Sequence, residues 1–244
     1  MTNQLKRLIH ALGYDVRGIR MTPRQLLQPH LLRPLEFDDV VCRLMYETKD
    51  ALTFIQVGAC DGLMQDPLRK YIVSRGWRGV MVEPQPASAR KLRELYKDNS
   101  RITVLQAALD RQPGIRSLFT INSPDAPEWA AGLASFQKEI VLRHAEIIPS
   151  IESMIAKVAV DCITFDSVFE HLPEGELDLL QIDTEGADPL ILSMFPFERI
   201  KPSLVHWEIK HLSLREREDC LGALTSQGYR VAASGNQDMM AVRF

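Results

Sequence analysis

LTFIQVGACDG (52–62) begins with a short apolar run, residues 52–58, that ends at a glycine. Two similar apolar runs follow, GVMVEP (79–84) and ITVLQAAL (102–109). Runs of this length, bounded by turn residues, are typical of buried strands. Helical signals lie between them, so the order along the chain is β-α-β-α-β. Strands joined through helices form a parallel sheet with right-handed crossovers.

The helical signals in this stretch are caps and periodicity. Asp66 followed by Pro67 is typical of a helix start, and Gly76 of a helix stop. Residues 87–97 carry Leu92, Leu95 and Tyr96 on one face. We therefore expect one helix after each of the first two strands.

The remainder of the chain continues the alternation. Further strands are predicted at 114–121, 158–165, 177–183 and 203–210. Asp188 with Pro189 predicts one helix start. Ser213 and Glu216 have capping-box spacing, and Gly228 should end that helix. YRVAAS (229–234) and MMAVRF (239–244) flank a Gly235-Asn236 turn and predict a closing antiparallel hairpin.

Two segments fall outside this pattern. Residues 1–50 read as an N-terminal helical segment, with helical periodicity at 5–12 and 37–45. Residues 51–244 then form one α/β domain. Within it, 122–157 is an irregular insertion with a helical stretch near 136–148, and an insertion of this length in an α/β fold is often a lid over a substrate site.

Composition limits the class of protein. The chain has 244 residues, of which 45% are hydrophobic and 25% charged, as in soluble globular domains. The net charge of −3 gives no basic excess for nucleic acid or an anionic membrane. The four cysteines have no metal-knuckle or redox spacing. We see no secretory signal and no membrane-spanning run, and expect a cytoplasmic protein.

Ligands of open α/β sheets bind beyond the carboxyl ends of the strands. The first strand ends in the Gly58–Gly62 turn, and the second ends at Glu83, an acidic residue placed to accept both hydroxyls of a ribose. The glycine spacing is G-x-x-x-G, which differs from the dinucleotide fingerprint. Asp183 and Glu185 follow a later strand, and His206, Glu208 and Lys210 share one face of the next.

Read in order, FIQVGACDG (54–62), GVMVEPQP (79–86), LLQIDTEGAD (179–188) and HWEIKHLS (206–213) resemble the FkbM-type S-adenosylmethionine-dependent methyltransferases. WAAGLASF (129–136) supports the resemblance, which covers about 52–240. It implies a Rossmann-like seven-stranded methyltransferase sheet, mostly parallel, with a C-terminal antiparallel hairpin. It also implies S-adenosylmethionine as the methyl donor.

The resemblance also assigns donor contacts. It implies that Glu83 holds the ribose hydroxyls. Many methyltransferases carry an acidic residue where this chain has Gln56, so the contact to the donor's ammonium passes to Asp61 or Asp183. The implied donor-binding residues are Gly58, Ala59, Cys60, Asp61, Gly62, Glu83, Pro84, Gln85, Ala107, Ala108 and Asp183.

Methyl transfer to a hydroxyl requires positioning and removal of a proton. The predicted catalytic residues are Asp183, Glu185, Glu208 and His211, with His206 a further candidate base and His144 able to approach from the insertion. Asp183 and Glu208 resemble, by strand position, the carboxylates that hold magnesium in catechol-type O-methyltransferases. Mg²⁺ bound by this pair is therefore a candidate cofactor.

The acceptor stays open at this level. The first hypothesis is O-methylation of a sugar hydroxyl on a glycan or a glycosylated metabolite. The second replaces this acceptor with a peptide or secondary metabolite, and the third is a non-catalytic module that binds the donor. We expect a small-molecule or saccharide acceptor and no nucleic-acid partner. The oligomeric state is not predicted.

Overall fold

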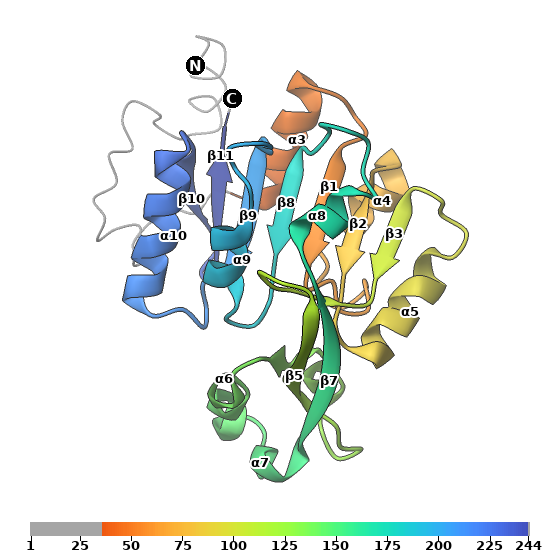
Figure 1. The fold of residues 1–244 in the computed structure, drawn as a ribbon, viewed down its shortest axis with the longest axis vertical. Coiled ribbons are helices and arrows are strands. Elements are labelled where there is room, and N and C mark those ends of the chain that lie inside the picture. Colours follow the sequence, from red (N-terminus) through yellow and green to blue (C-terminus); the bar gives the residue numbers. More distant parts are fainter. Residues whose placement is uncertain (1–35, 244) are drawn as a thin grey trace.

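The computed structural model of this chain describes residues 36–243, and its centre is a seven-stranded sheet in the order β10-β11-β9-β8-β1-β2-β3. Only β11 runs antiparallel to its neighbours (Figure 1). The predicted, mostly parallel sheet with a closing hairpin is thereby confirmed. The strands are β1 (Thr53–Val57), β2 (Arg78–Val82), β3 (Ile102–Leu105), β8 (Leu179–Ile182), β9 (Leu204–Glu208), β10 (Arg230–Ser234) and β11 (Asp238–Val242).

Helices cover both faces of this sheet. Because side chains alternate along a strand, Phe54 of β1 packs in one core with α3, α4 and α5, whereas Ile55 and Val57 pack in the other with α8, α9 and α10. The central strands β1, β8 and β9 are fully buried between these layers, as expected for a parallel sheet. The helices are α3 (Phe37–Glu47), α4 (Arg69–Arg75), α5 (Pro86–Tyr96), α8 (Phe165–Phe169), α9 (Asp188–Met194) and α10 (Leu214–Ser226).

The insertion differs from its prediction, because it is built on a second sheet of order β4-β7-β5-β6. Strand β5 (Gly114–Ile121) pairs along its whole length with β7 (Ile155–Ile163), and β6 (Ala134–Ser135) extends the sheet. In Figure 1 this second sheet lies beyond the carboxyl ends of the parallel strands of the large sheet. Between β5 and β7 lie η2 (Glu128–Gly132), α6 (Lys138–Leu142), η3 (Arg143–Glu146) and α7 (Ile151–Met154).

Two predicted strands are corrected by this second sheet. The run 102–109 is not one strand: β3 ends at Leu105, and β4 (Ala108–Leu109) pairs with β7 instead. Both halves are apolar, so the pattern cannot show the change of sheet. The predicted strand 158–165 begins earlier, at Ile155, because it continues to pair with β5. It ends at Ile163, before α8 starts.

The cap predictions are confirmed in part. Ser213 and Glu216 form a reciprocal capping box at α10, and Gly76 ends α4 in the left-handed conformation. Asp66 does not directly precede its helix, because α4 begins at Arg69. The predicted helix at 37–45 is α3, whereas the one at 5–12 lies outside the described residues. Over residues 36–243 no helix is long and apolar enough to cross a membrane.

Candidate functional site

A cavity of about 300 Å³ lies at the carboxyl ends of the parallel strands. Its walls come from the loops after β1, β2, β3, β8 and β9 and from the insertion. This is the position at which open α/β sheets bind ligands. The predicted residues that line it are Gly58, Cys60, Glu83, Pro84, Gln85, Ala107, Ala108, Asp183 and Glu185.

The glycine turn is fixed by close packing. Gly58 has φ of +82°, and a Cβ there would lie 1.7 Å from the carbonyl oxygen of Asp183. A Cβ on Gly62 would lie 2.5 Å from a methyl of Leu92. These glycines therefore let the loop after β1 pass against the loop after β8 and against α5. Three residues implied as donor contacts are not among those that line the cavity: Ala59, Asp61 and Gly62.

Glu83 is a buried carboxylate at the cavity wall, only 3% exposed. Its Oε2 accepts a hydrogen bond from the Cys60 backbone N–H and its Oε1 accepts one from the Gln85 N–H, both at 2.8 Å. Burial raises the pKa of Glu83 to about 7, although the two backbone hydrogen bonds oppose the shift. Each carboxylate oxygen keeps a second acceptor position, so this group can still receive two hydroxyls.

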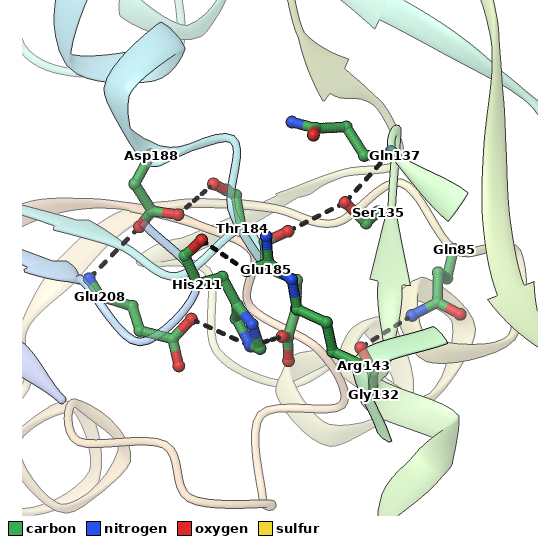
Figure 2. Close-up of polar contacts among 10 residues, drawn as sticks. All are labelled: Gln85, Gly132, Ser135, Gln137, Arg143, Thr184, Glu185, Asp188, Glu208 and His211. Carbon is green, nitrogen blue, oxygen red and sulfur yellow. Dashed lines mark hydrogen bonds and ion pairs between the residues drawn. The ribbon is translucent and has the colours of Figure 1, made fainter. Parts of the chain in front are cut away.

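Four hydrogen bonds attach the insertion to the loops of the large sheet. The Gln85 side chain donates to the Ala131 carbonyl at 3.2 Å and to the Gly132 carbonyl at 3.5 Å, of which Figure 2 draws the second. The Ser135 hydroxyl donates to the Glu185 carbonyl at 2.9 Å (Figure 2). Arg143 donates to the His211 carbonyl, also at 2.9 Å. The insertion therefore contacts the loops after β2, β8 and β9, each of which carries a predicted site residue.

Carboxylates converge at the ends of β8 and β9. Asp188 is fully buried; it accepts hydrogen bonds from the Thr184 hydroxyl at 2.9 Å and from the Glu208 N–H at 3.3 Å. It was expected to start a helix, and it is the first residue of α9, but these bonds direct its side chain toward β9. Burial raises the pKa of Asp188 to about 6.

Burial and mutual repulsion disfavour full ionisation of this group. Burial raises the pKa of Glu208 to about 9, and the Asp183, Glu185 and Asp188 carboxylates add to the shift. The pKa of Asp183 is raised well above its ordinary value, first by burial and then by the Asp188, Glu185 and Asp238 carboxylates. The exposed Lys210 ammonium opposes both shifts. The site therefore attracts protons or other cations.

His211 lies beside two of these carboxylates. Its Nε2 is 2.8 Å from Oε2 of Glu185 and 3.8 Å from Oε2 of Glu208 (Figure 2). His211, Glu185 and Glu208 form a group with three potential metal ligands within 4.8 Å of one another. Asp183, which the sequence paired with Glu208 as a metal ligand, is not part of this group.

The prediction of His206 as a base is wrong. Its Nδ1 lies 2.8 Å from the Gln181 side-chain oxygen and its Nε2 lies 3.1 Å from the Ser234 hydroxyl. Its ring packs on Phe37 of α3, with centroids 4.7 Å apart. Complete burial lowers the pKa of His206 to about 3. This neutral histidine is a structural link between β8, β9 and β10.

Gln56 also has a structural role. It is buried on the same face of the large sheet as His206, and its side-chain nitrogen donates a hydrogen bond to Asp66 at 3.3 Å. It is not among the residues that line the cavity. The sequence predicted that Asp61 or Asp183, in place of Gln56, contacts the ammonium of the donor. Of these two, Asp183 lines the cavity.

The sequence predicted that the insertion covers the substrate site, but not which of its residues form the cavity wall. Trp129 and Gly132 to Phe136 line it, as do Lys210 and Gln237 from the loops after β9 and β10. His144 was a candidate to approach from the insertion. It is buried, with its ring centroid 5.5 Å from that of His211 and 6.1 Å from that of Trp129. WAAGLASF (129–136) was the signal for this wall.

The strand order, the glycine turn after β1 and the carboxylate after β2 define a Rossmann-like methyltransferase fold. The model of the methyltransferase FkbM domain matches residues 56–231, which is more than half of the chain. The chain belongs to the FkbM methyltransferase family. No curated protein sequence matches it.

Three solved structures are similar to this chain, and the first of them supports the fold. A methyltransferase FkbM from Methylobacillus flagellatus KT is 16% identical, with a TM-score of 0.50 over 79% of this chain and 44% of that chain. The present chain thus spans less than half of that protein. A precorrin-6y C5,15-methyltransferase from Geobacter metallireducens GS-15 is 13% identical, with a TM-score of 0.42 over 86% and 91% of the two chains. An RNA methyltransferase from Salinibacter ruber, in complex with S-adenosyl-L-homocysteine, is 13% identical, with a TM-score of 0.37 over 86% and 94%.

Proposed function

We propose that this chain is an S-adenosylmethionine-dependent O-methyltransferase whose acceptor is a hydroxyl of a sugar, a glycan or a glycosylated metabolite. The observation that carries the proposal is the cavity itself, which joins a ribose-type carboxylate, Glu83, to the acidic group at Asp183 and Glu185. Its volume lies at the lower end of small-molecule sites, which are roughly 300–1,000 Å³.

The residues present fit the donor. Glu83 holds two free acceptor positions toward the ribose hydroxyls, and its own orientation is fixed by the Cys60 and Gln85 N–H groups. Pro84, Gln85, Ala107 and Ala108 give a flat, weakly polar wall for an adenine ring. Asp183 also lines the cavity, and its carboxyl oxygens can accept hydrogen bonds from the ammonium of the methionine end.

When bound, the donor supplies a methyl group activated on a sulfonium sulfur. Transfer of this methyl group to an acceptor oxygen would leave the sulfur uncharged and would require the hydroxyl proton to leave. Asp183 and Glu185 line the cavity and can receive it. Glu208 and His211 do not line the cavity, but they lie beside Glu185 and can take the proton onward. General-base assistance of this kind contributes about 10²–10⁴-fold to rate.

The net charge of the chain and the exposed aromatic side chain at the cavity wall support this class of acceptor. A net charge of −3 provides no electrostatic footprint for a nucleic acid. Trp129 is 39% exposed at the cavity wall, where an aromatic face can pack on the apolar side of a sugar ring. These features favour a small neutral or cationic acceptor with a hydroxyl group.

The test measures donor affinity and turnover separately. Turnover is the incorporation of a deuterated methyl group from labelled donor into a cell-envelope or metabolite extract. Glu208→Gln and His211→Asn should lower turnover by about 10²–10⁴-fold and change the donor-product affinity far less. Glu218→Gln, at an exposed position of α10, is the control that should leave both unchanged. Intact turnover in both site variants would place the chemistry elsewhere. Tight donor binding without transfer to any pool would indicate a non-catalytic donor-binding module.

A further inference from the structure

Three potential ligand atoms meet beside the cavity, and two of them, on His211 and Glu185, lie 2.8 Å apart as an ion pair. The three atoms are Oε2 of Glu185, Oε2 of Glu208 and Nε2 of His211. Each is buried and has no hydrogen bond within the described part of the chain. The side chain of His211 is 5% exposed and is thus more than nine-tenths buried, and that of Glu208 is 11% exposed. Buried polar atoms without hydrogen bonds are costly, and their convergence indicates a ligand.

The backbone behind each ligand atom is fixed by a different segment. Ser135 of the insertion holds the carbonyl of Glu185, and Arg143 holds the carbonyl of His211. The fully buried Asp188 holds the N–H of Glu208. Glu185 itself has φ of +48°, an uncommon conformation for a non-glycine residue. Support of this kind is what orients ligands in metal sites.

We propose that Glu185, Glu208 and His211 bind one divalent transition-metal cation at the edge of the cavity. The separations of 2.8 and 3.8 Å from His211 Nε2 bracket the spacing of about 3.0–3.4 Å expected between ligands held about 2.1 Å from one ion. One imidazole with two carboxylates suits Mn²⁺ or Zn²⁺ better than Mg²⁺, which prefers oxygen ligands alone. The site thus differs from the sequence-predicted Mg²⁺ pair in both ligands and ion.

The chemical role of the cation rests on the proposed function. Three protein ligands leave coordination positions open, and Glu185 also lines the cavity, so an acceptor hydroxyl can reach the ion. A hydroxyl bound to a divalent ion loses its proton more easily. His211 then acts as a ligand, and its removal impairs turnover through loss of the ion.

The experiment uses the full chain, treated with chelator and freed of it, and titrates it with MnCl₂ while electron paramagnetic resonance follows the unbound ion. One Mn²⁺ per chain should bind. Glu185→Gln and His211→Asn should each weaken this binding at least tenfold, and Glu94→Gln on the exposed surface of α5 should not. ZnCl₂ should compete for the same site.

Several results would overturn the proposal. One is the absence of binding of either ion, and another is one-to-one binding that both ligand variants retain. Loss of the ion in Asp183→Asn but not in Glu185→Gln would restore the Asp183–Glu208 pair. If a variant fails to fold, Mn²⁺ added to the unaltered chain must broaden the imidazole resonances of His211, and a sharp His211 signal rejects the site. Methyl transfer by a chain that binds no cation would reject this inference alone, whereas cation binding without methyl transfer would reject the proposed function.

Discussion

Replacing Glu83 by glutamine removes the charge that the proposed donor site requires and nearly preserves the shape of the side chain. The carboxylate is buried and already receives two backbone N–H groups, so the variant keeps one acceptor oxygen and turns an amide N–H₂ toward the other donor. A hydrogen bond to a charged group contributes about 1.5–3 kcal/mol. The dissociation constant for S-adenosylhomocysteine should therefore rise about 10- to 150-fold.

The pH dependence of the unaltered chain tests the same residue. The pKa of Glu83 is raised to about 7 without ligand, and its ionised form is the better acceptor for two hydroxyls. Affinity should therefore be highest above pH 7 and fall as the pH drops through 7 toward 6, because protonated Glu83 must first lose its proton. Binding at pH 6.5 should release protons. Asp188 and Asp238, with pKa values of about 6, titrate in both proteins, so the difference between the profiles isolates Glu83.

Isothermal titration calorimetry in buffers of different ionisation enthalpy measures affinity and proton release together. Glu94→Gln is the matched control, because this glutamate is exposed on α5 and should give the unaltered constant. A folded Glu83→Gln protein with unchanged affinity would refute the donor assignment. If affinity depended on pH in the same way for the unaltered chain and for Glu83→Gln, the inference that Glu83 must ionise to bind the donor would be refuted.

Further predictions concern the fold and the insertion. Gly58→Ala should prevent stable folding or lower the melting temperature sharply, because its Cβ would lie 1.7 Å from a backbone oxygen. Gly114→Ala is the control: its Cβ would meet open space, so the melting temperature should hardly change. Similar melting temperatures for the two variants would contradict this prediction. Hydrogen exchange in residues 122–157 should slow when donor product and acceptor are both present, and equal protection with and without ligands would argue against a lid. His206→Ala should lose about 1–3 kcal/mol of stability, measured by urea unfolding, and retain the pH profile of turnover; a changed profile would return His206 to the site.

Most of the large sheet could be predicted because each strand is a short apolar run next to a turn signal. The hairpin at Gly235 and the capping box at Ser213 were equally visible, since their chemistry is local. The second sheet was not predicted. Its long β5–β7 pairing joins residues separated by the whole insertion, and the change of sheet at Gln106 leaves no mark in an apolar pattern.

The candidate site, too, could be predicted where local patterns decide it and not where long-range packing does. Glu83, Asp183 and Glu185 could be placed because the carboxyl ends of parallel strands meet at one edge. The role of His206 was misjudged, since strand alternation gives the face of a side chain but not what packs on that face. Here Phe37 and Ser234 cover it. Trp129 and Ser135 reach the cavity wall through long-range packing of the insertion, which cannot be predicted from the spacing of residues in the sequence.

The central claim is transfer of a methyl group to an acceptor oxygen. The most direct measurement incubates the full chain with S-adenosylmethionine carrying a deuterated methyl group and a saccharide-rich cell extract, followed by fragmentation mass spectrometry of the labelled products. We expect a deuterated methyl ether on a sugar hydroxyl, and we expect it to be absent with Glu83→Gln at limiting donor. Label on nitrogen or carbon, or no labelled product although the donor binds, would contradict it.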